Sequence, residues 1–212
     1  MKKTFLFDMG NVWLLFDRSR SVDGLWDLRG CNCELSKVEL EELLSGSAAH
    51  RAFETGGVTE REFFAFLMKE LDIQASDEAE DAVRLRNSDL FVDRDSAACE
   101  LIIEVQRAGF PIALLSNTDP NHWWRVQRDH GDFLSVFGPN LFVSHEIKAR
   151  KPSREAYEYV INELSPGNPG EICLVDDLQV NIDGAVACQM DAVVYRSAEL
   201  LREALRGRGV RI

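Results

Sequence analysis

Residues 5–13, FLFDMGNVW, lead from a short apolar run into a carboxylate and then into a turn. The apolar run is typical of a buried strand, and Asp8 ends it abruptly. Gly10 and Asn11, which follow at once, are residue types that favour turns. Because ligands of doubly wound parallel sheets bind beyond the carboxyl ends of the strands, a charge at this point is a candidate binding or catalytic group.

The later part of the chain alternates short apolar runs of strand length with helical patterns. Together with the first run, the expected strands are residues 4–7, 111–115, 141–143, 172–175 and 192–195. The expected helices are residues 96–108, 120–130, 153–164, 179–189 and 197–206. This alternation, with continuously apolar strands, predicts an α/β fold whose core is a doubly wound, Rossmann-like parallel sheet covered on both faces.

The stretch that follows the first strand has no convincing strand and several helix starts. Ser36 and Glu39 form a capping box, and Thr59 and Glu62 repeat the same pattern. These signals predict an all-helical cap inserted after the first strand. The expected domains are an α/β core of residues 1–16 and 91–212 and a helical cap of residues 17–90.

Composition and charge exclude several classes of partner. The chain has 212 residues and a net charge of −12 at pH 7, which weighs against nucleic acid, where a basic face is expected. No stretch approaches the ~20 apolar residues that cross a bilayer, so we expect no membrane partner and a cytoplasmic location. The five cysteines, an odd number, are expected to be reduced. A monomer and a homodimer both remain open.

Polar side chains stand at the ends of three expected strands, and a lysine precedes the helix expected at residues 153–164. These residues are Asp8, Ser116, Asn117, Asp176, Asp177 and Lys151. Each alone is an ordinary turn residue, helix cap or surface charge. Carboxylates that meet in space, however, favour a divalent cation, and a hydroxyl and backbone N–H groups beside an ammonium suit a phosphoryl group. The set predicts a phosphoryl-transfer site.

Four motifs resemble, in order and spacing, the signatures of the haloacid dehalogenase (HAD) superfamily. They are FDMGNV (7–12), LLSNT (114–118), ARKP (149–152) and VDDLQVNIDGA (175–185). The resemblance runs the length of the core, and the helical insertion is similar to the cap of that superfamily. Within it, these motifs and the cap segment FETGGVTEREFFAFL (53–67) most resemble the bacterial α-D-glucose-1-phosphate phosphatase group.

The resemblance implies a nucleophile and a metal site. Asp8 stands in the place of the nucleophile that forms an aspartyl-phosphate, and Lys151 in that of the cation that neutralises it. Mg²⁺ is the implied cofactor. Its implied ligands are Asp8, the backbone carbonyl of Gly10, and a carboxylate from the pair Asp176 and Asp177, of which either can be the direct ligand.

The phosphate-binding residues that the resemblance implies are Ser116, Asn117, Gly10 and Asn11. The implied activity is Mg²⁺-dependent hydrolysis of a small phosphorylated metabolite such as a sugar phosphate. Gly10 stands where most phosphatases of the superfamily carry a second aspartate, the general acid. Because an anomeric hydroxyl leaves with less protonic help than an ordinary alcohol, this glycine favours a glycosyl 1-phosphate. Gly10 can equally serve a turn that needs a positive φ angle.

Two other functions are compatible with the sequence. A 2-haloacid dehalogenase shares the fold and the nucleophile and needs no general acid, but it has no use for the pair Asp176 and Asp177. A phospho-ligand-binding protein that has lost turnover with the second aspartate is the other alternative.

Substrate choice is expected to depend on the insert. Candidates by position are Phe16, His50, Arg51, Phe53 and Glu54. His122 can line the pocket and replace the missing acid, although a helix-start residue that faces the cap is the simpler interpretation. Packing is the expected role of Trp13, Trp123 and Trp124.

Overall fold

The computed structural model describes residues 3–165 and 167–212, and its centre is a parallel sheet. The strands are β1 (Thr4–Phe7), β4 (Ile112–Ser116), β5 (Leu141–Val143), β6 (Ile172–Asp176) and β7 (Asp191–Val194). They lie in the order β5-β4-β1-β6-β7, and all neighbouring pairs are parallel. Each strand begins and ends within one residue of its expected bounds, so the predicted fold class is confirmed.

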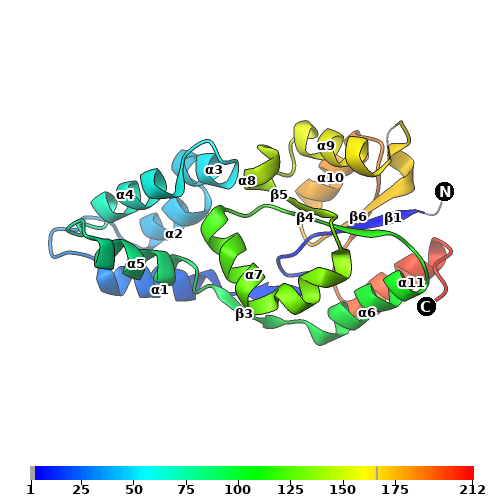
Figure 1. The fold of residues 1–212 in the computed structure, drawn as a ribbon, viewed down its shortest axis with the longest axis horizontal. Helices are drawn as coiled ribbons and strands as arrows, with labels where there is room; N and C mark the ends of the chain where they lie inside the picture. The colour runs from blue at the N-terminus through cyan, green and yellow to red at the C-terminus, as the bar shows by residue number, and fades with distance from the viewer. Residues whose placement is uncertain (1–2, 166) are drawn as a thin grey trace.

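Helices cover both faces of the sheet (Figure 1). One face carries α6 (Ser96–Arg107), α7 (Pro120–Leu134) and α11 (Ala198–Gly207), and the other carries α9 (Arg154–Leu164) and α10 (Gln179–Ala187). The single-turn elements of the core are α8 (Ser144–Ile147), η1 (Ser135–Phe137) and η2 (Pro169–Glu171). Along β1, Phe5 and Phe7 pack on the first face and Leu6 on the second, as the alternation of side chains in a strand requires.

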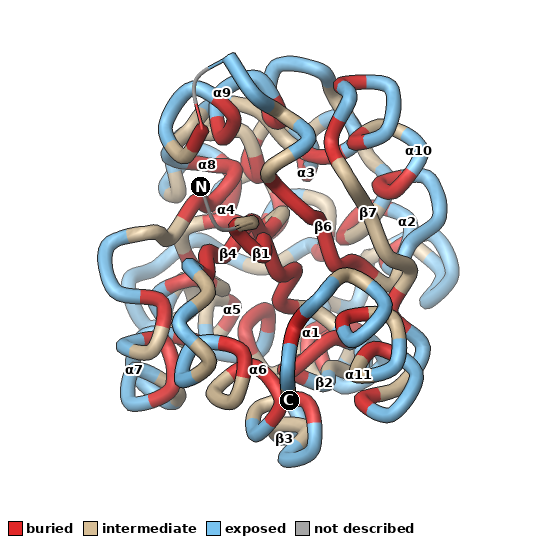
Figure 2. The backbone as a smooth tube through the Cα atoms, turned by 90° about the vertical axis from the view of Figure 1, so that its right-hand side faces the viewer, coloured by how far each residue is buried: buried red, intermediate tan, exposed pale blue. Residues whose placement is uncertain are grey.

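The three central strands are buried along their whole length, whereas β7 at the edge is only half-buried (Figure 2). Burial on both faces explains why their sequences read as continuous apolar runs and not as an alternation. β1 lies between β4 and β6, so the residues after these three strands meet at one edge of the sheet.

The insert forms five helices that pack around a hydrophobic cluster of their own. They are α1 (Arg18–Leu28), α2 (Lys37–Ser45), α3 (Ala48–Glu54), α4 (Glu60–Glu70) and α5 (Asp77–Asn87). The predicted capping boxes are confirmed: Ser36 and Glu39 exchange both bonds at the start of α2, and Thr59 and Glu62 do so at the start of α4. These helices lie beyond one end of the sheet (Figure 1).

A two-stranded antiparallel ribbon connects the insert to the core, and the sequence pattern did not predict it. Its strands are β2 (Leu14–Phe16) and β3 (Phe91–Arg94). The chain leaves the core through β2 and returns through β3, so the ribbon holds the two connections side by side. Both strands are short, and the whole insert separates them in the sequence. They therefore show neither a local turn signal nor a regular alternation of apolar and polar residues.

Two further expectations concern the whole chain. The five cysteines, all of which the structure describes, are free. Among the described residues, no helix combines the length and the apolar character that a membrane span requires.

Candidate active site

Asp8 lies directly after β1, at the carboxyl edge of the sheet. Its N–H donates to the carbonyl of Val175 in β6 at 2.8 Å, which continues the pairing of the two strands by one residue. The turn that follows is closed by the N–H of Asn11, which donates to the carbonyl of Leu14 at 2.9 Å. Asn11 has a φ angle of 54°, so it is the residue of this turn that adopts the left-handed backbone conformation.

Gly10 is therefore not the residue with the positive φ angle, and that interpretation of the glycine is wrong. The structure gives a steric reason instead. A Cβ atom built on Gly10 would lie 2.8 Å from Cε1 of Phe16, closer than a methyl group and an aromatic carbon can approach. The ring of Phe16 covers the position, so a side chain on residue 10 would require the ring to move.

Lys151 joins the two carboxylates that the sequence placed at the ends of β1 and β6. Its Nζ atom donates to Oδ1 of Asp8 at 2.7 Å and to Oδ2 of Asp176 at 2.6 Å, and only 1% of its surface is exposed. Burial alone would lower the pKa of Lys151, but the two carboxylates outweigh burial and raise it above its ordinary value. The ammonium group therefore carries its charge in this buried position.

Asn117 holds the backbone of Lys151. Its Oδ1 atom accepts from the N–H of Lys151, and its Nδ2 atom donates to the carbonyl of Lys151, both at 2.8 Å. The side chain of Asn117 thus positions the lysine, so that a bound anion would meet the backbone N–H of Asn117 and not its amide group. Ser116 ends β4 beside it and lines the cavity described below.

Burial and charge act together on Asp8. Burial raises its pKa to about 7, with a further increase from Asp176 that the ammonium group of Lys151 only partly offsets. One lysine cannot neutralise two buried carboxylates completely, so this site holds an excess of negative charge.

Asp8, Asp176 and Asp177 each place one carboxylate oxygen within 4.8 Å of the others. The oxygens of Asp176 already accept bonds from Lys151, from the N–H of Leu178 at 2.9 Å, and from Nδ2 of Asn181 at 2.9 and 3.0 Å. Three hard oxygen donors so close together fit a small divalent cation such as Mg²⁺.

Asp177 is the more accessible member of the acidic pair. It lines the cavity and is half-buried, whereas Asp176 is fully buried beneath Lys151. Burial raises the pKa of Asp177, the neighbouring Asp176 raises it further, and a hydrogen bond from Asn11 opposes both. The sequence pattern did not distinguish the two carboxylates, but burial does.

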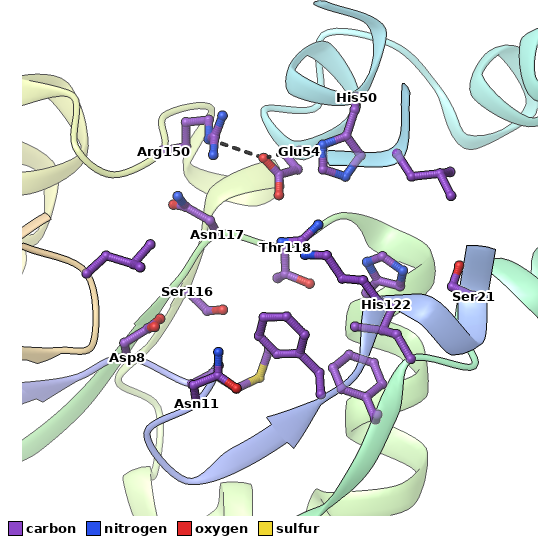
Figure 3. Close-up of a pocket in the computed structure, with 18 of the residues that line it drawn as sticks. Asp8, Asn11, Ser21, His50, Glu54, Ser116, Asn117, Thr118, His122 and Arg150 are labelled. Atoms are coloured by element: carbon purple, nitrogen blue, oxygen red, sulfur yellow. Dashed lines mark ion pairs between the residues drawn. The ribbon is translucent and has the colours of Figure 1, made fainter. Parts of the chain in front are cut away.

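A cavity of about 440 Å³ lies between the strand ends and the insert. The predicted site residues that line it are Asp8, Gly10, Asn11, Ser116, Asn117, Lys151 and Asp177. Figure 3 shows Asp8 and Asn11 on one side of it and His50 and Glu54 of α3 on the opposite side. The cavity is large enough for a small metabolite.

Two candidates from the insert line the cavity and two do not. His50 and Glu54 are four residues apart on α3 and share the face that points into the cavity (Figure 3). Arg51 lies on another face of the same helix and is exposed, and Phe53 stacks on Phe63 inside the insert with ring centroids 4.2 Å apart. The expectation that Arg51 and Phe53 contact substrate is therefore wrong.

His50 is buried and uncharged. Burial lowers the pKa of His50 to about 4. Its neighbour Glu54 forms an ion pair with Arg150 of the core, whose Nε lies 3.1 Å from Oε2 of Glu54. Burial raises the pKa of Glu54, and Arg150 opposes this effect.

His122 faces the insert from the start of α7, as the simpler interpretation predicted. Its Nδ1 atom lies 2.7 Å from Oδ2 of Asp119, and its Nε2 atom donates to the carbonyl of Asn87 at 3.0 Å. Burial alone would lower the pKa of His122, but Asp119 and Asn87 outweigh it and raise the pKa. Because both ring nitrogens are engaged, His122 is not a free substitute for the missing acid.

The tryptophans act mainly in packing. Trp13 and Trp123 are buried in the core, and the exposed Trp124 lies beneath the guanidinium of Arg128. Sequence reasoning missed Arg150 and Asn181 as site residues. Both had a signal, since they stand inside the motifs ARKP and VDDLQVNIDGA.

Comparison with known proteins identifies the family. A sequence model of the haloacid dehalogenase-like hydrolases matches residues 2–189. The chain belongs to this family. Among curated protein sequences, none matches the chain at a significant level.

Solved structures of HAD proteins share the fold. A HAD family enzyme from Bacteroides thetaiotaomicron is 21% identical, with 92% of this chain and 94% of that chain covered and a TM-score of 0.78. A second structure of that enzyme is a complex with magnesium and inorganic phosphate. A HAD-like family hydrolase from Porphyromonas gingivalis is 20% identical, with 97% and 98% covered and a TM-score of 0.80. At these identities the similarity establishes the fold of this HAD chain.

Proposed function

We propose that this HAD protein is a Mg²⁺-dependent phosphomonoester hydrolase with Asp8 as its nucleophile. The observation that carries the proposal is the buried cluster in which Lys151 bridges Asp8 and Asp176 beside a cavity, with Asp177 on the cavity wall. A carboxylate nucleophile, a charged ammonium and a cluster of hard oxygen ligands are the parts that phosphoryl transfer requires. The magnesium and phosphate bound by the Bacteroides enzyme support the same chemistry here.

In the first step, a carboxylate oxygen of Asp8 attacks phosphorus, and the bond between phosphorus and the leaving oxygen breaks. The bonding electrons stay on that oxygen, which takes a proton from solvent water. Water then attacks the aspartyl-phosphate at phosphorus, releases inorganic phosphate and restores the carboxylate. Because Lys151 binds Oδ1, we assign the attack to Oδ2. Ser116 and the backbone N–H of Asn117 hold the phosphoryl oxygens.

Mg²⁺ would be held by Asp8, the backbone carbonyl of Gly10 and Asp177, with Asp176 behind them. We assign the direct contact to Asp177 because both oxygens of Asp176 already accept protein hydrogen bonds. When bound, the ion neutralises the carboxylate cluster and polarises the phosphoryl group. The side chain of Asn11 opposes the rise in the pKa of Asp177 and would orient this ligand, a role that differs from the phosphate contact that the resemblance implies.

The proposed substrate is a small phosphorylated metabolite, and a glycosyl 1-phosphate is favoured. Residue 10 offers no carboxylate to protonate the leaving group, and His122 is occupied by Asp119 and Asn87. A leaving group that needs little protonation suits such a site. The resemblance of the motifs to the glucose-1-phosphate phosphatase group supports the same substrate.

We further propose that residues 17–90 act as a cap over a core of residues 1–16 and 91–212. The separate hydrophobic cluster of α1 to α5 and the ribbon β2–β3 support this division. Because the cavity has walls from both parts, opening of the cap would admit the substrate and closure would exclude water from the cluster.

The test is phosphate release from a panel of phosphorylated metabolites with and without Mg²⁺, with Asp8→Asn as the blank. We expect steady Mg²⁺-dependent release, and faster turnover of glucose 1-phosphate than of glucose 6-phosphate. A preference for the 6-phosphate would refute the leaving-group argument. Halide release from 2-haloacids without Mg²⁺ would instead identify a dehalogenase, and a single burst without steady turnover would identify a phospho-ligand-binding protein.

A further inference from the structure

Two buried polar atoms on the cap side of the cavity have no hydrogen-bond partner among the residues that the structure describes. They are Nδ1 of His50 and Oε2 of Glu54. Only 5% of His50 and 7% of Glu54 is exposed, and both side chains point into the cavity (Figure 3). An unpaired buried polar atom costs about 1–3 kcal/mol, so these positions call for a ligand that bonds them.

Arg150 completes this group from the core side. Its Nε atom lies 3.1 Å from Oε2 of Glu54, but it too has no partner with hydrogen-bond geometry among the described residues. Nδ1 of His50 lies 3.9 Å from the same oxygen. The three side chains therefore stand together with unused bonding capacity: an acceptor on Glu54, a donor on Arg150, and an imidazole nitrogen on His50 that can play either part.

The charges of this group sum to zero, which restricts what it can bind. Glu54 is negative, Arg150 is positive, and burial keeps the imidazole of His50 neutral by lowering its pKa. A second phosphate or a carboxylate on the ligand would face Glu54, and an ammonium group would face Arg150. Arg18 also lines the cavity, but it is exposed, so water screens its charge.

Hydroxyl groups match these atoms, because each hydroxyl both donates and accepts. One hydroxyl can donate to Glu54 while its neighbour accepts from Arg150. The cavity also offers the aromatic rings of Phe16 and Phe91 and the side chain of Leu44, which suit the C–H groups of a polyhydroxylated ring or chain.

We infer that His50, Glu54 and Arg150 form a subsite that binds the hydroxyl groups of an uncharged, polyhydroxylated leaving group. This inference rests on the proposed phosphatase function and adds the substrate class: sugar or polyol monophosphates, with no second anionic group and no amine on the part that enters the cap. The three residues bind the part of the substrate that leaves, while Asp8 and Lys151 act on the phosphoryl group.

The first test compares glucose 1-phosphate and glucose 6-phosphate with p-nitrophenyl phosphate, which has no hydroxyl group on its leaving group. The variants are His50→Leu and Glu54→Gln, and the matched control is Arg51→Gln on the same helix. For both sugar phosphates we expect kcat/KM to fall at least ~10-fold in each variant, mainly through KM, because each lost bond leaves its partner unsatisfied. For p-nitrophenyl phosphate we expect a change of less than about 3-fold, because chemistry at phosphorus is untouched.

The outcomes separate the inference from the proposed function. If the wild-type protein releases phosphate neither from p-nitrophenyl phosphate nor from any metabolite of the panel, the proposed function fails. If the wild-type protein hydrolyses p-nitrophenyl phosphate but hydrolyses the sugar phosphates no better, the proposed function stands and the subsite is overturned. The same conclusion follows if kcat/KM falls equally for the sugar phosphates and for p-nitrophenyl phosphate in the variants. Circular dichroism and the melting temperature show whether each variant is folded, and Glu54→Gln decides the test if His50→Leu unfolds.

A second test uses the charge of the subsite. Fructose 1,6-bisphosphate is compared with glucose 6-phosphate in the wild-type protein and in Glu54→Gln. The substitution leaves Arg150 without its counter-ion, so the ratio of kcat/KM for the bisphosphate to that for the monophosphate should rise at least about 3-fold. If Glu54 has only a structural role, kcat/KM should fall equally for the bisphosphate and for the monophosphate. An unchanged or smaller ratio of the two kcat/KM values would overturn the inference.

Discussion

The ring of Phe16 covers Gly10 so closely that a Cβ atom on residue 10 would lie 2.8 Å from Cε1 of the ring. The contact follows from the chain path, because the turn after Asp8 is closed at Leu14 and β2 then carries Phe16 back over the loop. The absence of a second carboxylate in this loop and the presence of an aromatic cavity wall are thus one structural feature. Adding the acid requires displacement of the ring.

We therefore predict that Gly10→Asp alone destabilises the protein. Forcing a side chain against a packed ring costs about 1–3 kcal/mol, so the free energy of unfolding should fall by that amount in urea denaturation. In the double variant Gly10→Asp with Phe16→Ala, the steric cost of the aspartate should be largely removed.

The double variant also tests the chemistry. With space for the carboxylate, turnover of a substrate with a poor leaving group, such as glucose 6-phosphate, should rise by up to about 10²-fold relative to Phe16→Ala alone. Gly10→Asn in the same background is the control, because it adds a similar volume without an acid. Equal rates for the aspartate and asparagine variants would show that the added group does not act as an acid.

This position also shows where sequence reasoning stops. Glycine in a turn suggested a positive φ angle, yet that angle belongs to Asn11, and the reason for Gly10 lies in a ring six residues later. Steric contact between a loop and a returning strand has no periodicity, so it does not appear in a pattern of residue types.

Our second prediction concerns the three carboxylates around Lys151. In the absence of metal, their mutual repulsion should destabilise the fold, so Asp177→Asn should melt at the same temperature as the wild-type protein or higher. Mg²⁺ should reverse this order. At a free concentration of 100 times Kd it stabilises the wild-type protein by about 2.7 kcal/mol, and Asp177→Asn should lose most of that shift.

Differential scanning calorimetry over a Mg²⁺ titration measures both effects. Asp183→Asn is the matched control, because Asp183 is an exposed acid in α10 that lies outside the cluster. A full Mg²⁺ shift in Asp177→Asn would contradict the assignment of Asp177 as the direct ligand.

The third prediction concerns Asn117, whose side chain holds both backbone groups of Lys151. Asn117→Ala removes two bonds and should lower the free energy of unfolding by about 1–3 kcal/mol. It should also lower kcat by up to about 10²-fold, with a smaller change in KM, because a displaced lysine mainly affects the transition state. Asn140→Ala is the control, since Asn140 bonds the backbone of Ile112 outside the cavity. An unchanged kcat in a folded Asn117→Ala protein would exclude a positioning role.

The fold was far more predictable than the substrate-facing wall. The strands and helices of the core follow from apolar periodicity, and neighbouring parallel strands necessarily bring Asp8 and Asp176 together once their order is known. His50 and Arg51, by contrast, are adjacent in sequence and similar in type, yet one is buried at the cavity and the other is exposed. That difference depends on how α3 is rotated against the core, which a pattern within one short helix does not determine.

Arg150 and Asn181 illustrate a second limit. Each stands inside a recognised motif, but their roles depend on partners far away in the sequence: Glu54 in the insert and Asp176 at the end of β6. A motif identifies the residues that touch the reacting group more readily than those that hold them in place.

The last prediction concerns the ion pair of His122 and Asp119, which joins the start of α7 to the end of α5 through the carbonyl of Asn87. The pKa of His122 is raised above its ordinary value of 6.5 in the folded protein. The pair should therefore contribute its full stability below pH 6.5 and lose it as the pH rises through the raised pKa, where the imidazolium is deprotonated. His122→Gln leaves Asp119 buried without a counter-charge, which costs about 3–5 kcal/mol at pH 6.

Urea denaturation of the wild-type and His122→Gln proteins at pH 6 and pH 9 measures this difference, which should be smaller at pH 9. His130→Gln on the same helix is a control of opposite sign, because burial lowers the pKa of His130. His130 binds a proton more tightly in the unfolded chain than in the folded protein. The wild-type protein should therefore gain stability relative to the His130→Gln variant as the pH rises from 5 to 7, because the unfolded chain then loses that proton. A difference for His122 that is constant with pH would show that Asp119 and His122 are held by packing and not by charge.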